Sequence, residues 1–244
     1  MDADPRLAAH RQVWQKKPAL RKIYADYYRR NTYHCTDGQT LEIGAGSGHI
    51  REHMDQVFMA DILPAEWLDV AADAQQLPFG DASLGNIVML DVLHHIERPA
   101  ALFDEVARVL RPGGRMVMLD PAITIGSWPV YKFLHTEPVN MRVDPLYEEC
   151  SQSSGDPFDS NQAVPTLLFS SSGRHKKFEA RFPSLRVAAR QFFGFAAYPL
   201  TGGFQNWCIV PSSLISPLLS VERHLEPFLA RLLGFRLLVA LERL

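Results

Sequence analysis

Hydrophobic and polar residues follow a regular order over the first half of the chain. Short apolar runs typical of buried strands occupy residues 39–43, 57–60, 67–72, 86–90 and 115–119. Between the last two runs, residues 100–110 follow the 3.6-residue period of a helix, which ends at the Arg-Pro-Gly-Gly sequence that begins at Arg111. Strands that alternate with helices and loops predict an α/β fold with a doubly wound parallel sheet.

The pattern changes halfway along the chain. Residues 122–183 are rich in proline, serine and aromatic residues, and their periodicity is weak. A segment this long without regular structure is usually functional, so we predict a substrate lid inserted between the fifth and sixth strands. Residues 184–244 then supply the last two strands and a helix, and residues 1–38 form a helical cap before a core at 39–121. We expect the whole chain, 1–244, to form a single domain.

The predicted C-terminal helix carries an apolar stripe. Ser216 and Pro217 fit its N-cap and first helical position, and Gly234 fits its end. A stripe of this kind most often covers a sheet, although a dimer surface or a membrane-surface helix would show the same period. A homodimer therefore stays open as an alternative to a monomer. The stripe consists of Leu218, Val221, Leu225, Phe228 and Leu232.

Composition and charge narrow the class of protein. The 244 residues carry a formal net charge of −2, whereas proteins that grip the phosphates of nucleic acids are usually basic. Cys35, Cys150 and Cys208 are too few and too far apart for a disulfide framework or a zinc site built on cysteine pairs. The N-terminus is polar, and no apolar run has the length of a transmembrane helix. We expect a cytoplasmic protein that acts on a small molecule, with no nucleic-acid partner and no transmembrane segment.

A glycine-rich sequence, Leu-Glu-Ile-Gly-Ala-Gly-Ser-Gly at residues 41–48, follows the first predicted strand. Glycines allow a sharp turn and the close approach of a ligand, and a helix after the loop would point its N-terminus at that ligand. Asp61 and Asp73 stand at the ends of the next two predicted strands, where a carboxylate can accept hydrogen bonds from ribose hydroxyls. NAD-binding proteins share these features, but the G-x-G-x-G spacing departs from their G-x-G-x-x-G.

Several ordered motifs resemble those of class I S-adenosylmethionine-dependent methyltransferases. Residues 41–48 look like motif I of that family, and the similarity continues through 73–79, 90–96 and 107–114. The segment 39–120 is similar to methyltransferase type 11 proteins, the group that includes ubiquinone-biosynthesis methyltransferases. The resemblance implies a Rossmann-like fold, with a seven-stranded mixed sheet, helices on both faces and an antiparallel last strand.

The resemblance also implies a role for each matching residue. S-adenosylmethionine would be the cofactor and S-adenosylhomocysteine the product, with Glu42 at the ammonium group, Asp61 at the ribose and Asp73 at the adenine amino group. The glycines would line the amino-acid end and the sugar, and Asp91 would lie by the methionine moiety. Carboxylates suit a cofactor that carries a sulfonium and an ammonium but no phosphate, although a carboxylate at a strand end can also simply cap a helix. The implied set is Glu42, Gly44, Ala45, Gly46, Gly48, Asp61, Ile62, Asp73, Ala74, Asp91 and Val92.

Candidate catalytic residues lie in the predicted lid and after the fourth strand. Tyr131 and His135 are four residues apart, so a helical turn would place them on one face, and Glu137 precedes a proline that disfavours helix. We hypothesise that His135 deprotonates the acceptor while Glu137 orients it, with His95 as a further candidate. The alternative is that these histidines are structural, as lone histidines usually are. The substrate-binding candidates are Tyr28, His94 and Tyr131.

No metal site is expected, because no other histidine or cysteine lies at a suitable local spacing. The expected reaction is in-line attack by a small apolar or aromatic acceptor on the sulfonium methyl group, with alignment of the reactants as the main contribution of the enzyme. Two alternatives from other classes remain: an NAD-dependent oxidoreductase, and a non-catalytic module that keeps the fold.

Overall fold

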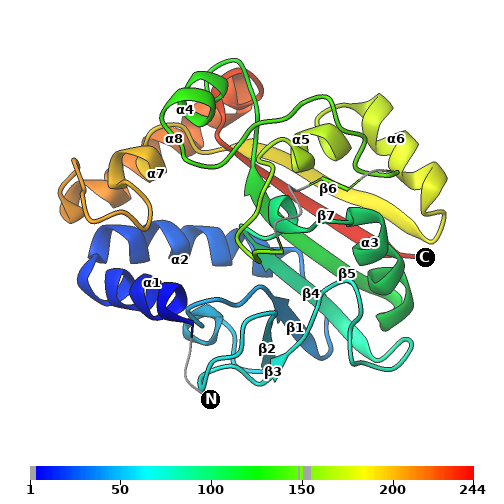
Figure 1. The fold of residues 1–244 in the computed structure, drawn as a ribbon. Helices are drawn as coiled ribbons and strands as arrows, with labels where there is room; N and C mark the ends of the chain where they lie inside the picture. Colours follow the sequence, from blue (N-terminus) through cyan, green and yellow to red (C-terminus); the bar gives the residue numbers. More distant parts are fainter. Residues whose placement is uncertain (1–3, 148, 151–154) are drawn as a thin grey trace.

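A computed structural model describes residues 4–147, 149–150 and 155–244. Within these residues, the centre of the molecule is a sheet of seven strands in the order β3-β2-β1-β4-β5-β7-β6 (Figure 1). β1 to β5 run parallel, and β7 is antiparallel to both of its neighbours, so the predicted mixed sheet is confirmed. The strands are β1 (Thr40–Ile43), β2 (Val57–Asp61), β3 (Val70–Ala71), β4 (Leu84–Leu90), β5 (Leu110–Pro121), β6 (Leu185–Phe193) and β7 (Arg236–Arg243).

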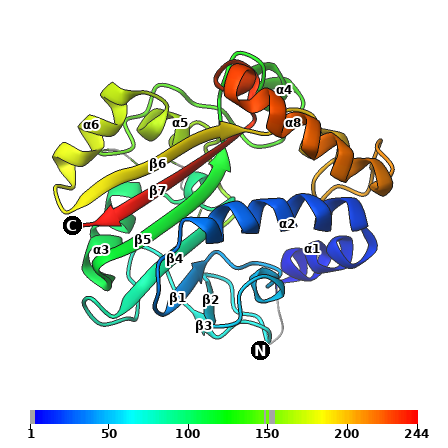
Figure 2. The same cartoon turned by 180° about the vertical axis from the view of Figure 1, so that it is seen from behind.

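Helices cover both faces of the sheet (Figures 1 and 2). Successive side chains of a strand point to opposite faces, so Val88 and Leu90 of β4 pack under one helical layer while Ile87 and Met89 pack under the other. The first layer contains α1 (Pro5–Lys16), α2 (Pro18–Tyr33), α7 (Ala197–Thr201) and α8 (Ser212–Leu233), and the second contains α3 (Pro99–Val109), α5 (Val164–Phe169) and α6 (Ser172–Arg181).

Aromatic packing joins the helices of the second layer. Phe103 of α3 and Phe178 of α6 meet edge to face with ring centroids 4.8 Å apart, and Phe169 of α5 lies 4.9 Å from Phe178. Burying each ring stabilises the fold by about 1.5–3 kcal/mol. Because α5 and α6 lie inside the range predicted as a lid, their part of that range belongs to the core. The lid prediction is therefore kept for residues 122–163, which contain α4 (Trp128–Phe133).

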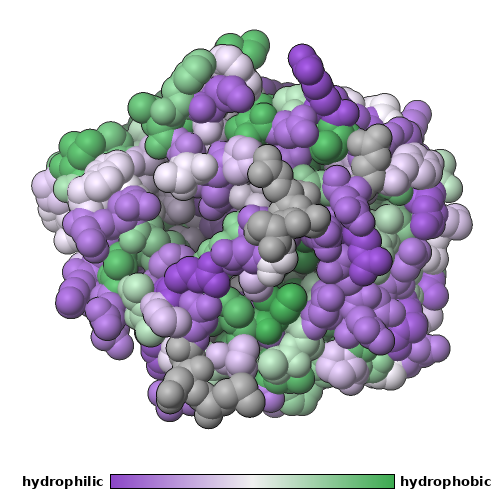
Figure 3. All heavy atoms as spheres, viewed as in Figure 1, coloured by the Kyte–Doolittle hydropathy of each residue, from purple (hydrophilic) through white to green (hydrophobic). Residues whose placement is uncertain are grey.

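The C-terminal helix α8 differs from its prediction in both its start and its buried side. It begins at Ser212, so Pro217 lies inside the helix rather than at its first position, while Gly234 ends it as predicted. Four of the five residues of the predicted apolar stripe are exposed, Phe228 by 82%, whereas Leu218 packs against the core. Apolar side chains gather along the part of the surface where α4 and α8 lie in Figure 1 (Figure 3). The residues that α8 does bury are Ile215, Leu219, Glu222 and Ala230.

Polar contacts decide which side of α8 is buried. Arg30 of α2 forms an ion pair of 2.8 Å with Glu226, and Arg223 forms one of 3.1 Å with the buried Asp26 of α2. These ion pairs attach the charged side of α8 to α2, which leaves most of the apolar stripe in solvent. In the part of the chain that the structure describes, no helix is long and apolar enough to cross a membrane.

Candidate active site

A cavity of about 390 Å³ opens at the carboxyl ends of β1 to β4. Ligands of open α/β sheets bind at this edge, because the loops that leave the parallel strands meet there. Residues of the segment 122–163, of α1, α2 and α7, and the start of β7 complete its walls. The predicted site residues that line it are Tyr28, Glu42, Gly44, Ala45, Gly46, Asp61, Ile62, Asp73, Ala74, Asp91, Val92, His94, His95, Tyr131, His135 and Glu137.

The glycine loop forms the floor of the cavity next to β1. Gly44 has a φ of +68°, and a Cβ atom there would lie 2.3 Å from Cγ2 of Val92, so no larger residue fits. Gly46 has a φ of +49°, and its N–H donates to Oδ2 of Asp61 at 2.8 Å. The first two glycines therefore allow the backbone of the loop to form the floor of the cavity without side chains that would fill it.

Gly48 has a different role from the one that the resemblance implied. It is not among the residues that line the cavity, and a Cβ atom on it would lie 2.6 Å from the indole of Trp67. The same indole donates from Nε1 to the carbonyl oxygen of Gly46 at 2.8 Å. Gly48 is thus required by the packing of Trp67, which fixes the loop from behind.

The long helix expected after the glycine loop is absent from the described residues that follow it. Only a short 3₁₀ helix, η1 (Ile50–Glu52), stands between the loop and β2. Too few residues separate Gly48 from Val57 for an α-helix and a return to the sheet. The expectation of a helix at this point is therefore wrong for the described residues.

Glu42 supplies an unpaired acceptor beneath the loop. Its side chain is buried, and its Oε1 accepts a hydrogen bond of 3.1 Å from the Tyr28 hydroxyl. Its Oε2 has no hydrogen-bond partner among the described residues. Burial raises the pKa of Glu42 to about 8. A buried carboxylate oxygen without a partner fits a cationic ligand group such as an ammonium.

Asp61 and Asp73 stand on the same wall, at the ends of β2 and after β3. Asp61 accepts from the N–H groups of Gly46 and of Leu63, the latter at 3.0 Å, and burial raises its pKa. Asp73 accepts from the Gln75 N–H at 2.8 Å. Both carboxylates therefore also brace their own loops, and these contacts orient them along the cavity.

Asp91 is paired more strongly than the sequence indicated. It has a φ of +58°, an uncommon backbone conformation for a residue other than glycine. Arg236, at the start of β7, forms an ion pair with both of its oxygens, and the Tyr24 hydroxyl donates to Oδ2 at 3.1 Å. Arg236 is fully buried, and its guanidinium also lies 4.2 Å from the centre of the Tyr198 ring.

Two tyrosines predicted to bind substrate have engaged hydroxyls. Tyr28 donates to Glu42, as described above, and Tyr131 donates to the Phe235 carbonyl oxygen at 2.9 Å. Burial raises the pKa of Tyr131 above its usual range. Their rings line the cavity, so these residues offer an apolar surface and hold neighbouring elements in place.

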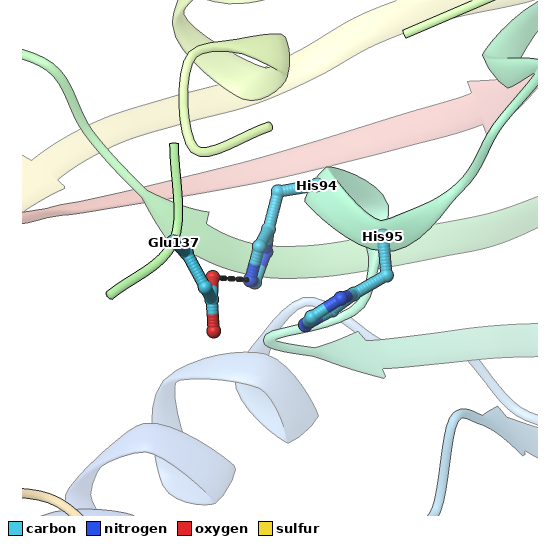
Figure 4. Close-up of side chains that lie close together, drawn as sticks. All are labelled: His94, His95 and Glu137. Atoms are coloured by element: carbon cyan, nitrogen blue, oxygen red, sulfur yellow. Dashed lines mark ion pairs between the residues drawn. The ribbon is translucent and has the colours of Figure 1, made fainter. Parts of the chain in front are cut away.

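His94 lies between two carboxylates. Its Nδ1 is 2.7 Å from Oδ1 of the buried Asp120, and its Nε2 is 3.3 Å from Oε2 of Glu137 (Figure 4). Burial opposes a positive charge here, but hydrogen bonds with Asp120 and Glu137 outweigh it and raise the pKa of His94 to about 10. The position is therefore built to hold a positive charge.

The neighbouring His95 has the opposite environment. Burial and the nearby His94 lower its pKa to about 4. Its Nδ1 lies 3.2 Å from the Asp159 carbonyl oxygen, which selects the tautomer that carries hydrogen on Nδ1. His95 is thus a neutral imidazole at the cavity wall, with Nε2 as its basic nitrogen.

The predicted pairing of His135 with the carboxylate of Glu137 is wrong. Glu137 directs its carboxylate at His94 and accepts a hydrogen bond from Gln162, while only its backbone N–H reaches Nδ1 of His135, at 3.3 Å. The rings of Tyr131 and His135 lie close together, with centroids 5.7 Å apart, but His135 follows the end of α4, so the two residues do not share a helix face. Burial lowers the pKa of His135.

Comparison with known proteins identifies the segment that carries the glycine loop and its carboxylates. Residues 41–118 match the methyltransferase domain family. This segment resembles a methyltransferase domain. It is 38% identical over 86 residues to 27-O-demethylrifamycin SV methyltransferase of Amycolatopsis mediterranei, a match that covers 35% of this chain and 31% of the relative. It is 36% identical over 70 residues to a ubiquinone/menaquinone biosynthesis C-methyltransferase of Roseobacter denitrificans, covering 29% and 26%.

These matches span between about a quarter and a third of the length of the relatives, whereas likeness to solved structures extends over most of the chain. A methyltransferase of Archaeoglobus fulgidus that depends on S-adenosylmethionine has a TM-score of 0.55 at 15% identity, covering 92% of this chain and 94% of that one. Geranyl diphosphate C-methyltransferase of Streptomyces coelicolor gives 0.52 at 12%, covering 92% and 82%. The [4+2]-cyclase SpnF gives 0.51 at 12%, covering 91% and 80%. The class I methyltransferase fold is therefore confirmed.

Two residues of the site lie beyond the segment that matches the methyltransferase family and were missed in the sequence. Asp120 follows the apolar run of the fifth strand, and Arg236 interrupts the apolar pattern of the last one. A charged residue in a buried strand indicates a buried partner, and that signal could have drawn attention to both. Their partners, His94 and Asp91, follow the fourth strand inside that segment and could not be paired with them from spacing alone.

Proposed function

We propose that this protein transfers a methyl group from S-adenosylmethionine to a small acceptor. The observation that carries the proposal is the acidic wall formed by Glu42, Asp61 and Asp73 beside the glycine loop. S-adenosylmethionine has a cationic amino-acid end, a ribose and an adenine, and it lacks phosphate. The wall offers carboxylate acceptors for such groups.

The residues of the cavity fit the ammonium group of the cofactor, which needs a buried acceptor. Oε2 of Glu42 is buried and has no partner among the described residues, so an ammonium placed there would satisfy it. Asp61, already oriented by the loop, can accept from ribose hydroxyls, and Asp73 can accept from an adenine amino group. When bound, the cofactor supplies an electrophilic methyl group on a sulfonium.

The chain contributes alignment and exclusion of water at the other end of the cavity. His94, His95 and Glu137 face the cavity there, and Phe158 and Phe204 add apolar surface. A cavity of about 390 Å³ suits a small acceptor with apolar parts in addition to the cofactor. Holding the acceptor in line with the methyl group is the main source of rate that such a site can provide.

The fold by itself does not settle the chemistry, because a [4+2]-cyclase shares it. Calorimetry with S-adenosylmethionine, S-adenosylhomocysteine and NAD tests the proposal directly. We expect the two sulfur compounds to bind and NAD not to bind. Asp61→Asn should weaken cofactor binding by about tenfold or more, since a charge-assisted hydrogen bond contributes ~1.5–3 kcal/mol.

Asp55→Asn is the matched control, because Asp55 is exposed and precedes β2 at the opposite end from Asp61. It should bind the cofactor as the wild type does. Binding of NAD in place of S-adenosylmethionine, or an unchanged affinity in folded Asp61→Asn, would contradict the cofactor assignment. Methyl transfer itself is then measured by screening small acceptors with a methyl-labelled cofactor.

A further inference from the structure

Three side chains with metal-ligating atoms converge at the acceptor end of the cavity. His94 and His95 belong to the 3₁₀ helix η2 (Leu93–His95), and Glu137 comes from the lid segment after α4. One ligand atom from each of the three lies within 4.8 Å of the other two (Figure 4). Nε2 of His94 and Oε2 of Glu137 are 3.3 Å apart, which is close to the ~3.4 Å between two ligands of one tetrahedral ion.

Both imidazoles have the outer partners that metal-binding histidines require. A ligating histidine almost always donates its second ring N–H to a carboxylate or a backbone carbonyl, which fixes its tautomer and orientation. Nδ1 of His94 lies 2.7 Å from the buried Asp120 carboxylate, and Nδ1 of His95 lies 3.2 Å from the Asp159 carbonyl oxygen. Each ring is thereby left with Nε2 as its ligand atom for the cavity.

The third ligand is also oriented. Gln162 donates from Nε2 to the Glu137 carboxylate, and this contact holds it against His94. The Glu137 side chain remains 28% accessible, so it can move by the ~1 Å that drawing the three ligands around one ion requires.

We infer that His94, His95 and Glu137 bind one divalent transition-metal ion, and that oxygen atoms of the acceptor complete its coordination. Two imidazoles and one carboxylate suit zinc, iron, cobalt or manganese better than magnesium or calcium, which prefer all-oxygen sites. Three protein ligands leave positions open for substrate, as in catalytic sites. The inference reverses the expectation from the sequence that no metal site exists.

A metal ion at this position would select a class of acceptor for the methyl transfer. This part of the inference rests on the proposed function as a methyltransferase. An acceptor with two adjacent oxygen donors, such as a catechol or a hydroxyl beside a carbonyl, would chelate the ion through its open positions. A metal lowers the pKa of a bound hydroxyl, so the hydroxyl proton passes to solvent. The acceptor oxygen then forms a bond to the methyl carbon as the S–C bond of the sulfonium breaks. The electron pair of the broken S–C bond stays on sulfur, which gives the neutral thioether product.

Metal binding is tested on the full chain after treatment with EDTA, with no cofactor present. Calorimetry with Zn²⁺ and the visible spectrum of added Co²⁺ should both give one ion per chain. His94→Gln, His95→Gln and Glu137→Gln should each weaken binding by more than tenfold, and Asp120→Asn by 10–100-fold through the ring it orients. His224→Gln removes an imidazole from the exposed side of α8 and should leave the affinity unchanged.

The acceptor class is tested with catechol on the Co²⁺-loaded protein, using phenol as the matched control. Catechol should change the Co²⁺ spectrum at concentrations at which phenol does not. A wild-type chain that binds no ion, or binding unaffected by the three ligand variants, would overturn the metal site and leave an ion pair between His94 and Glu137. Metal binding without any binding of S-adenosylmethionine would instead refute the proposed function and leave the site standing.

Discussion

Glu42 shows how a single buried carboxyl group ties the stability of the fold to its site. It lies on β1, and its Oε1 accepts a hydrogen bond from the Tyr28 hydroxyl. Burial raises its pKa to about 8. In the unfolded chain its pKa is about 4.3, so between these values the folded state keeps a proton that the unfolded state releases. The stabilising contribution of the neutral group is therefore fully present below pH ~4.3 and is lost as the pH rises through about 8.

Replacing Glu42 by Gln should separate this effect from packing. Gln keeps the size and hydrogen-bonding capacity of the neutral acid but cannot ionise. We expect the gain in stability from Glu42→Gln to be larger at pH 9 than at pH 5, by on the order of 3 kcal/mol, as read from urea unfolding at both values. Asp55→Asn, in an exposed position, should show no such difference. A gain that is equal at both pH values would contradict a raised pKa.

At the scale of the element, α8 owes its position to polar contacts rather than to its apolar stripe. Glu222 is buried, and its Oε1 accepts from the N–H groups of Ala196 and Ala197 at 2.6 and 2.7 Å. These are the N–H groups of the N-cap and of the first residue of α7, which have no partners within that short helix. One carboxylate on α8 therefore orders the segment that follows β6.

On α8, replacing a buried charged residue should therefore lower the stability of the fold more than replacing an exposed apolar residue. Glu222→Ala leaves two buried N–H groups unpaired and should destabilise the fold by about 1–3 kcal/mol. Phe228→Ser, on the exposed stripe, should change stability by no more than about 0.5 kcal/mol. Thermal unfolding of both variants tests this expectation. A larger loss for Phe228→Ser would mean that the stripe, and not the charged side, holds the helix.

At the scale of the whole molecule, Arg236 and Asp91 connect segments that are 145 positions apart. The pair joins the first residue of β7 to the loop after β4, and Tyr24 and Tyr27 of α2 reach it through their hydroxyls. The last strand, the loop after β4 and the N-terminal helices thus meet at one buried ion pair. Removing one partner leaves an uncompensated charge, which is more costly than losing both.

A double-mutant cycle should measure this coupling. Arg236→Met and Asp91→Asn should each destabilise the fold by about 3 kcal/mol, and the double variant by less than the sum of the two. The matched control is the surface pair Arg181 and Asp104, 3.4 Å apart, for which Arg181→Met and Asp104→Asn should show a coupling below about 1 kcal/mol. Additive losses for Arg236 and Asp91 would mean that the pair does not stabilise the assembled fold.

The sequence alone determined the fold class and the position of the glycine loop and its carboxylates. Alternating apolar runs predicted a parallel sheet, whereas the order of its strands came only from the structure. The loop can adopt positive φ angles because its glycines lack a Cβ atom. Carboxylates at strand ends reach the cavity because parallel strands all end at one edge, which is why Asp61 and Asp73 were placed correctly in the sequence.

Only the tertiary structure decided which charged groups meet. The pairs of His94 with Asp120, of Glu137 with His94, and of Asp91 with Arg236 join segments that meet only in the folded molecule. The buried side of α8 likewise depends on tertiary contacts, because Asp26 and Arg30 of α2 form ion pairs with Arg223 and Glu226 of α8. Local periodicity reports where a side chain points on its own element, whereas the partner that it finds depends on the long-range packing of the other elements.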